Sequence, residues 1–397
     1  MPALPPWLLV FPILALLILV HELGHFITAK RFGIKVIEFG FGFPPRIFGF
    51  SRNDTIYSIN LLPIGGFVKM LGEEDPEDPK SFARQPIPVR IIVLAAGSIM
   101  NILVAILVFT SISVLPHNVV IGDIAIAGVA PYSPAEQADL KVGDIIESVN
   151  GVRINKTSAL IREIQSKTDE KTQLTVRRRS IVGNISSSPE FSTLETLEIT
   201  PRKETPNLKV VDEVKYPKQE ISLEQARSYN GTLEIGDTMV QGPLGVLIGT
   251  TNPRMVSERL SILNALGSSV NKITNVITYT FTSIGGWITD GKNPGLTGPI
   301  GIAQVTGEVA KVGVRPILEL TALISISLAI VNILPIPALD GGRLLFVLIE
   351  AARGGKKIPP NKEGLIHMVG FATLIGLIIL MSYYDLVRIL TGEQLLQ

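Results

Sequence analysis

Four long apolar segments constrain the fold of this 397-residue chain more than any other feature. They lie at about residues 6–29, 91–115, 318–339 and 365–383, and each could cross a hydrocarbon core of about 30 Å. The chain is 46% hydrophobic but still 18% charged, which is too polar for membrane helices alone. The pattern therefore predicts a membrane core together with a soluble domain.

The distribution of Lys and Arg predicts how these segments are oriented. Nine such residues lie between residues 30 and 90 and four more between 353 and 362, whereas none precedes the first segment. Because basic loops favour the cytoplasmic side, we expect both loops in the cytoplasm and residues 116–317 and both termini outside. The total charge of +1 gives no indication of nucleic-acid binding, and the bilayer is the expected environment.

A pentapeptide, His21-Glu22-Leu23-Gly24-His25, ends the first apolar segment. On a helix, His21 and His25 share one face and could bind a single Zn²⁺, while Glu22 could act as general base on a metal-bound water. At ~1.5 Å per residue, the apolar run before the pentapeptide carries it ~20 Å into the membrane, where ionisable groups are costly and usually functional. The chain has no cysteine, so His, Asp and Glu are the plausible metal ligands.

Two prolines and two glycines interrupt the third segment, which ends in Asn332 through Gly342. A broken helix at membrane depth is tolerated where its backbone is buried in protein or lines a wet cavity. Asp340 is the only carboxylate between Glu319 and Glu350, so it is the expected third ligand, and three ligands leave a position for water. As an alternative, Asp340 caps the following helix. Four other side chains are rival ligands: Glu308, Glu350, His367 and Asp385.

Residues 39–72 have the pattern of β-structure. Arg46–Phe50 and Thr55–Leu61 are expected to form a hairpin, and Leu61–Lys69 an apolar loop after it. The hairpin either caps the helices or pairs with an extended substrate. In the second segment, Asn101 either bonds a facing helix or holds a substrate backbone.

Residues 119–250 have the composition of a soluble α/β domain, with strands expected near 123–130, 144–149 and 173–178 and helices near 134–140 and 158–167. Residues 129–135, 143–146 and 149–151 resemble a PDZ domain. The stretch Gly242–Val246, with Gly245, is similar to the carboxylate-binding loop of such domains, in a circularly permuted order. Helical spacing from Leu260 to Trp287 predicts an amphipathic helix along the outer interface, because a fifth span would reverse the segment that carries Asp340.

The predicted fold is a multi-spanning α-helical membrane protein with four transmembrane helices, a cytoplasmic β-hairpin and an inserted extracytoplasmic α/β PDZ-like domain. Residues 1–118 hold the first two membrane helices and the hairpin, and 119–250 the PDZ-like domain. Residues 251–317 hold the interfacial helix and a linker, and 318–397 the last two membrane helices.

The chain resembles the bacterial site-2 proteases, which are intramembrane zinc metalloproteases. The likeness rests on His21–His25, residues 62–69, the PDZ-like region, Gly298–Ile302 and Asn332–Gly342, and one departure is Ser98, where the family often has proline. It implies a Zn²⁺ cofactor on His21, His25 and Asp340, with Glu22 as catalytic base. The candidate substrate-binding residues are Asn101, Asn332 and Gly245.

The resemblance also implies a location and a class of substrate. It implies a multi-pass protein of the bacterial inner membrane whose active site lies toward the cytoplasm. The expected partners are single-span membrane proteins such as anti-sigma factors, or signal-peptide remnants, with the PDZ-like domain admitting trimmed substrates.

Two other functions fit parts of the sequence. A non-catalytic, membrane-bound PDZ scaffold that binds peptide tails would keep residues 119–250 and need no zinc, so metal content separates it from a protease. A metal transporter could also bury His and Asp, but it would be expected to repeat its ligands along a path.

Overall fold

The computed structural model describes residues 5–73, 78–179, 191–203, 205–216, 219–290 and 298–391. These form two compact units, one of Met1–Leu115 with Arg259–Gln397 and one of Pro116–Glu258. Within the described residues, four helices are long and apolar enough to cross a membrane, as predicted. They are Pro6–Arg31, Ile87–Val114, Val314–Ile333 and Lys362–Thr391.

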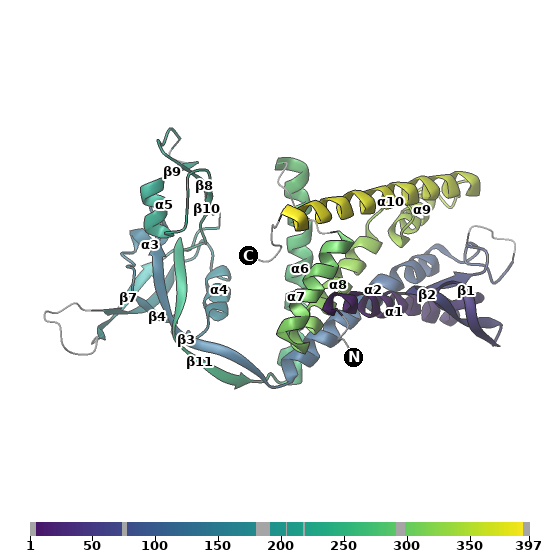
Figure 1. Ribbon diagram of the computed structural model, residues 1–397, viewed down its shortest axis with the longest axis horizontal. Helices are drawn as coiled ribbons and strands as arrows, with labels where there is room; N and C mark the ends of the chain where they lie inside the picture. The colour runs from purple at the N-terminus through teal and green to yellow at the C-terminus, as the bar shows by residue number, and fades with distance from the viewer. Residues whose placement is uncertain are drawn as a thin grey trace. The chain divides into compact units, whose positions relative to one another are not determined.

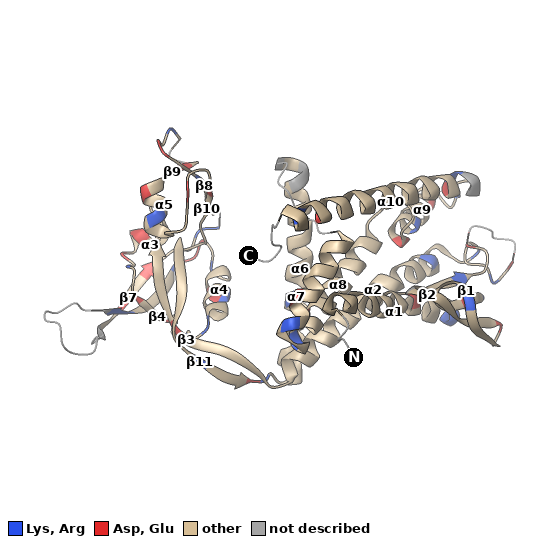
Figure 2. Cartoon of the chain, in the orientation of Figure 1, with Lys and Arg blue, Asp and Glu red and all other residues tan. Residues whose placement is uncertain are grey.

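Three helices form the core of the first unit (Figure 1). Helix α2 (Ile87–Val114) packs against α1 (Val10–Arg31, which follows the short helix η1, Pro6–Leu9) and against α8 (Val314–Ile333). Ala105 on α2 and Ala322 on α8 are fully buried in one cluster, and such small side chains let membrane helices approach closely. Figure 2 shows few charged residues along these helices, as a lipid environment requires.

Helix α6 (Ile262–Asp290) was expected from the spacing after Leu260, and it is amphipathic. Its Ile273 is buried in the cluster with α2 and α8, whereas Leu263 and Tyr279 are exposed. It is not among the helices apolar enough to span a membrane. A further helix, α7 (Pro299–Val312), occupies part of the region expected to be a linker.

The predicted hairpin is longer than expected. Strand β1 runs over Val36–Arg52 and β2 over Thr55–Met70. The expectation of a loop at Leu61–Lys69 was wrong, because residues 66–70 pair with the start of β1 and continue the sheet. Several large apolar side chains of the hairpin are exposed: Ile47, Phe48, Phe50, Ile59 and Leu61.

The third membrane helix ends earlier than predicted. Helix α8 stops at Ile333, and the loop of residues 334–339 that follows contains Pro335 and Pro337, which have no N–H to continue the helical bonding. Helix α9 (Asp340–Ala352) then begins, and α10 (Pro360–Thr391) completes the unit.

The second unit is built on an antiparallel sheet in the order β11-β3-β4-β6-β7, with β5 paired to β4. Ile124, Ile146 and Leu174 are buried in its core. The strands of this sheet are β3 (His117–Val129), β4 (Ile145–Val149), β5 (Val152–Arg153), β6 (Thr172–Arg179), β7 (Phe191–Ile199) and β11 (Val246–Glu258). A smaller sheet has β8 (Asn207–Val211) between β9 (Glu220–Ser222) and β10 (Thr238–Val240), and the helices are α3 (Pro134–Gln137), α4 (Thr157–Gln165) and α5 (Leu223–Tyr229).

The limits of this unit follow from one strand pair. Strands β3 and β11 remain paired as far as His117 and Glu258. The compact unit therefore includes residues on both sides of the expected range 119–250.

Candidate metal centre

Two imidazoles and one carboxylate converge beside the first membrane helix. His21 and His25 lie on one face of α1, one turn apart, and Asp340 is the first residue of α9. The Oδ2 atom of Asp340 is 2.9 Å from His21 Nε2 and 3.0 Å from His25 Nε2, and the two nitrogens are 3.2 Å apart. Tetrahedral zinc with bonds of about 2.0–2.1 Å separates its ligand atoms by about 3.3 Å, so this spacing suits zinc after a small adjustment.

The other nitrogen of each imidazole decides whether Nε2 is free for a metal. His25 Nδ1 donates to the carbonyl oxygen of Val93, at 2.8 Å, so the neutral ring keeps its Nε2 lone pair toward Asp340. His21 Nδ1 lies 3.5 Å from the side-chain amide of Asn101, whose Oδ1 is buried with no partner among the described residues. With the Asn101 amide turned so that Oδ1 faces the ring, His21 Nδ1–H has an acceptor. The donor set then fits zinc, with both Nε2 atoms free.

A glycine on the second membrane helix makes room for the imidazoles. A Cβ atom added at Gly97 would lie 2.4 Å from His25 Nε2 and 2.6 Å from His21 Nε2. Any larger residue would therefore occupy the space in which the ligand atoms meet.

Glu22 lies beside the two histidines and is held by the hairpin. The backbone N–H of Val68, on β2, donates to Glu22 Oε2 at 3.0 Å. A cavity of about 330 Å³ is lined by Glu22, His21, Asp340, Asn101 and Asn332, among others. The structure thus places five of the predicted site residues around one cavity, with His25 in contact with two of them.

Two ion pairs hold helix α9 against neighbouring parts of the unit. Arg90 on α2 makes a buried, two-pronged pair with Glu350, with contacts of 2.9 and 2.6 Å. Arg343 contacts Glu73 at 2.6 Å. These contacts fix the helix whose first residue is Asp340.

The alternative roles considered for these side chains find little support in the structure. Asp340 makes no side-chain capping bond to α9 and faces the histidines instead. Each rival ligand has another partner in the structure. Glu350 pairs with Arg90, Glu308 accepts from Gln304, Asp385 accepts from the Gly301 N–H, and His367 accepts from the Ala338 N–H.

Sequence reasoning missed the groups that orient the site. The carbonyl of Val93 and the N–H of Val68 are backbone atoms, so their residue types carry no signal. Gly97 lies in an apolar segment, and nothing in its spacing indicates a contact with His25.

Gly245 belongs to the second unit. It has φ +73°, and a Cβ atom there would lie 2.3 Å from Ser133 Cβ, so the loop requires glycine. Beside the loop, Arg202 donates to Gln241 and its backbone N–H to Pro243. No carboxylate of the described residues pairs with Arg202, and burial lowers the pKa of its guanidinium.

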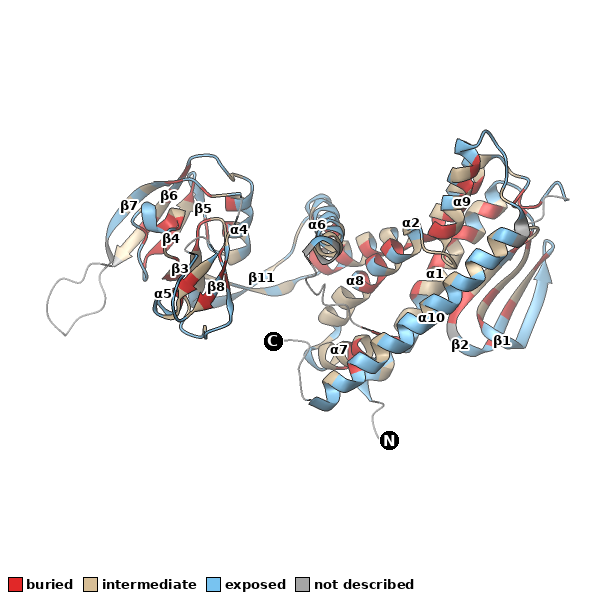
Figure 3. Ribbon diagram, turned by 90° about the horizontal axis from the view of Figure 1, so that it is seen from above, coloured by how far each residue is buried: buried red, intermediate tan, exposed pale blue. Residues whose placement is uncertain are grey.

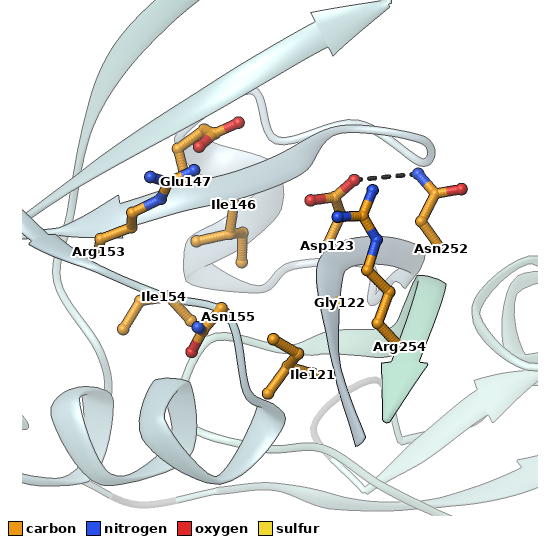
Figure 4. Close-up of a pocket in the computed structure, with 10 residues that line it drawn as sticks. All are labelled: Ile121, Gly122, Asp123, Ile146, Glu147, Arg153, Ile154, Asn155, Asn252 and Arg254. Carbon is orange, nitrogen blue, oxygen red and sulfur yellow. Dashed lines mark hydrogen bonds between the residues drawn. The ribbon is translucent and has the colours of Figure 1, made fainter. Parts of the chain in front are cut away.

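The second unit has a cavity of about 390 Å³, and none of the predicted site residues lines it (Figure 4). Asp123 and Asn252 are joined there by a hydrogen bond of 3.1 Å, and Arg153 and Arg254 also line it. In the part of the chain that the structure describes, the group of three side chains that could hold a metal is His21, His25 and Asp340.

Comparison with known proteins matches the chain to metalloproteases. The model of peptidase family M50 matches residues 9–377. The chain is 28% identical to the zinc metalloprotease RasP of Shouchella clausii, over 95% of this chain and 97% of the relative. It is also 28% identical to the regulator of sigma-W protease RasP of Bacillus subtilis, over 94% of this chain and 96% of the relative.

Proposed function

Because the chain belongs to peptidase family M50, the site-2 family of membrane zinc metalloproteases, we propose that it cleaves single-span membrane proteins within their transmembrane segments. The observation that carries the proposal is the convergence of His21, His25 and Asp340 at one cavity that Glu22 also lines. The cavity adjoins helices long and apolar enough to span a bilayer. The peptide bond that reaches it would therefore come from a membrane segment.

The residues of the site divide the work of hydrolysis. A zinc ion held by His21, His25 and Asp340 would polarise the scissile carbonyl and lower the pKa of a water molecule. Glu22 would take the proton from that water and pass it to the leaving amine. The Val68 N–H fixes Glu22 Oε2, which leaves Oε1 to exchange the proton.

Two asparagines of the cavity suit further roles. Asn101 lies against His21 Nδ1 and would hold that ring in place, and it could also contact substrate. Asn332 lines the same cavity at the end of α8 and would bind the backbone of the unwound substrate. A transmembrane helix hides its carbonyl groups in its own hydrogen bonds, so it must unwind before attack.

The hairpin could offset part of the cost of unwinding. Its segment 46–61 presents exposed apolar side chains, including Phe48, Phe50 and Ile59. An extended substrate segment could pair with it as an added strand. Of the two roles open to the hairpin, pairing with substrate is therefore proposed over merely capping the helices.

The second unit would select substrates as a PDZ-like domain. Strand β11 is at the end of its sheet, and Thr250 on it approaches Thr157 of α4 to 3.4 Å between hydroxyl oxygens. A peptide tail could bind along β11 with its carboxylate at the Gly242–Gly245 loop, where Arg202, which donates to Gln241 and Gly242, supplies positive charge. Trimmed membrane proteins with new carboxyl ends would then be the preferred substrates.

We place the protein in the bacterial inner membrane, with its active site toward the cytoplasm. The basic residues of 30–90 support this orientation, and a relative named regulator of sigma-W protease supports a role in regulated intramembrane proteolysis, with anti-sigma factors or signal-peptide remnants as substrates. Reporter fusions after Lys80 and Lys357 should be cytoplasmic and a fusion near Lys167 outside. A cytoplasmic signal at Lys167 would contradict the orientation.

The deciding experiment compares purified wild type with Glu22→Gln on a labelled single-span substrate. Glutamine keeps the size of the side chain but cannot accept the proton, so zinc should stay bound while turnover falls about 10²–10⁴-fold. Glu319→Gln, at a half-buried carboxylate paired with Arg315 on α8, is the matched control and should cleave normally. Product masses that fall outside the apolar segment, or normal turnover in Glu22→Gln, would refute the proposal.

A further inference from the structure

Helix α10 packs less tightly than the other membrane helices. In the four candidate spans, the buried share of the most apolar stretch is 28%, 39% and 33% for the first three and 0% for α10. Figure 3 shows α10 exposed along most of its length. The few close contacts that α10 makes are therefore informative. Two of them, from His367 and Gly370, are with the loop that precedes Asp340.

One backbone N–H group of this loop, at residues 334–339, finds its acceptor on α10. Pro335 and Pro337 have no N–H. The Ile336 N–H bonds Leu334 O at 2.6 Å and the Leu339 N–H bonds Ile336 O at 3.2 Å. The Leu334 N–H still bonds Ile330 O of α8, at 3.2 Å. The Ala338 N–H donates to a side chain on α10, His367 Nδ1, at 2.9 Å.

Ala338 has a backbone conformation that needs support. Its φ is +79°, which a residue with a Cβ atom rarely adopts and which persists only where the surroundings impose it. It lies two residues before Asp340, so a change in its conformation would move the carboxylate directly.

His367 is itself held on two sides. Its ring makes an edge contact with Phe346 of α9, with centroids 5.3 Å apart. Glu363, one turn earlier on α10, lies 3.9 Å from His367 Nε2. The ring therefore spans from α10 to both the loop and the helix that Asp340 begins.

Gly370, one turn after His367, makes the second contact. A Cβ atom added there would lie 2.3 Å from Pro337 Cβ. Successive turns of α10 thus contact successive residues of the loop, Pro337 and Ala338.

We propose that His367 is a positioning residue for the metal site: by accepting the Ala338 N–H, it holds the loop so that Asp340 faces His21 and His25. The inference rests on the proposed function, because it assumes that Asp340 is a metal ligand. His367 does not bind the metal, since the nitrogen that faces the loop is already engaged. Helix α10 therefore controls the geometry of the site from outside the ligand set.

The test measures zinc affinity of the full-length protein by chelator competition and records the visible spectrum of the cobalt-substituted form. His367→Leu removes the acceptor, whereas Asn can place Oδ1 where Nδ1 was. Loss of a group that orients a metal ligand typically costs about 10–100-fold in metal affinity. We expect a loss of that order and an altered cobalt spectrum in His367→Leu, and affinity within about threefold of wild type in His367→Asn. Met368→Leu, at an exposed neighbour, should match wild type.

A second pair of variants protects the test if His367→Leu does not fold. Gly370→Ala should weaken zinc binding through Pro337, whereas Gly376→Ala, with no atom within 4 Å of its added Cβ, should not. Wild-type affinity and an unchanged spectrum in a folded His367→Leu, or an Asn variant as weak as Leu, would overturn the inference. If wild type binds no zinc, or Asp340→Ala binds it normally, the proposed function fails instead.

Discussion

At the scale of single residues, the candidate metal site requires both its three ligands and a neighbouring residue with no side chain. The three ligand atoms meet where Gly97 presents no side chain, and His25 keeps its orientation through the carbonyl of Val93. Asn101 is fully buried against His21, and its backbone carbonyl accepts a hydrogen bond from the Ser325 hydroxyl of α8. The site is therefore lined by α2 residues that bind no metal but decide where the imidazoles lie.

We predict that Gly97→Ala abolishes tight zinc binding although no ligand is changed. Its Cβ would lie 2.4 Å from His25 Nε2, closer than real contacts allow, so the imidazoles must move apart. Gly267→Ala on α6, where an added Cβ meets nothing within 4 Å, is the control. Zinc analysis of both purified variants checks the prediction, and full occupancy in Gly97→Ala would show that the site can expand.

At the scale of helices, α9 carries a ligand at its first residue and is anchored near its end. Glu350, near its carboxyl end, is 7% exposed and makes a paired contact with Arg90, which is 6% exposed. Such a buried pair adds little net stability compared with apolar side chains, but the loss of one partner leaves a charge unpaired. The pair thus specifies how α9 lies on α2.

We predict that Arg90→Ala lowers the free energy of unfolding by about 3–5 kcal/mol, because the Glu350 carboxylate stays buried alone. Replacing both partners, as Arg90→Met with Glu350→Leu, should recover most of the loss. Unfolding in detergent micelles measures both.

The control for this prediction is Arg343→Ala. Its ion pair with Glu73 is partly exposed, so the cost should stay under about 1 kcal/mol. Equal losses in the single and double variants would mean that the packing of Arg90, not its charge, matters.

At the scale of the whole molecule, one unit holds the metal centre and the other is inserted between α2 and α6. The insertion begins and ends at neighbouring points, because the Leu260 N–H bonds the carbonyl of Ser113 at 3.0 Å. In the first unit, the end of α2 and the chain before α6 therefore lie side by side, so a short linker could join them if the second unit were deleted.

We predict that a chain lacking Pro116–Glu258, with Leu115 joined to Arg259 by a short linker, still binds zinc and cleaves a wider range of substrates. The reason is that the proposed filter is lost while the site is kept. Cleavage of trimmed and untrimmed single-span substrates measures the change, and the same deletion carrying Glu22→Gln should cleave neither. Loss of zinc from the folded deletion variant would make the second unit structural.

The sequence alone determined the features that depend on neighbouring residues. Hydropathy is a local sum, so the four membrane segments were found, and the four-residue spacing of His21 and His25 is fixed by the geometry of a single helix. Turn and proline signals also placed a break after Asn332 and a β-hairpin near residue 52. Its apolar loop at 61–69 was misjudged because strand pairing with residues 36–41, not local composition, decides its conformation.

Only the tertiary structure decided which distant groups meet. His21 and Asp340 are 319 positions apart, and the sequence offered Glu308, Glu350, His367 and Asp385 as rivals. Packing gives each rival another partner, and it brings Gly97, the Val93 carbonyl and the Val68 N–H to the site. No pattern along the chain encodes these contacts, because they depend on how helices and strands lie against one another once buried hydrogen-bonding groups must all find partners.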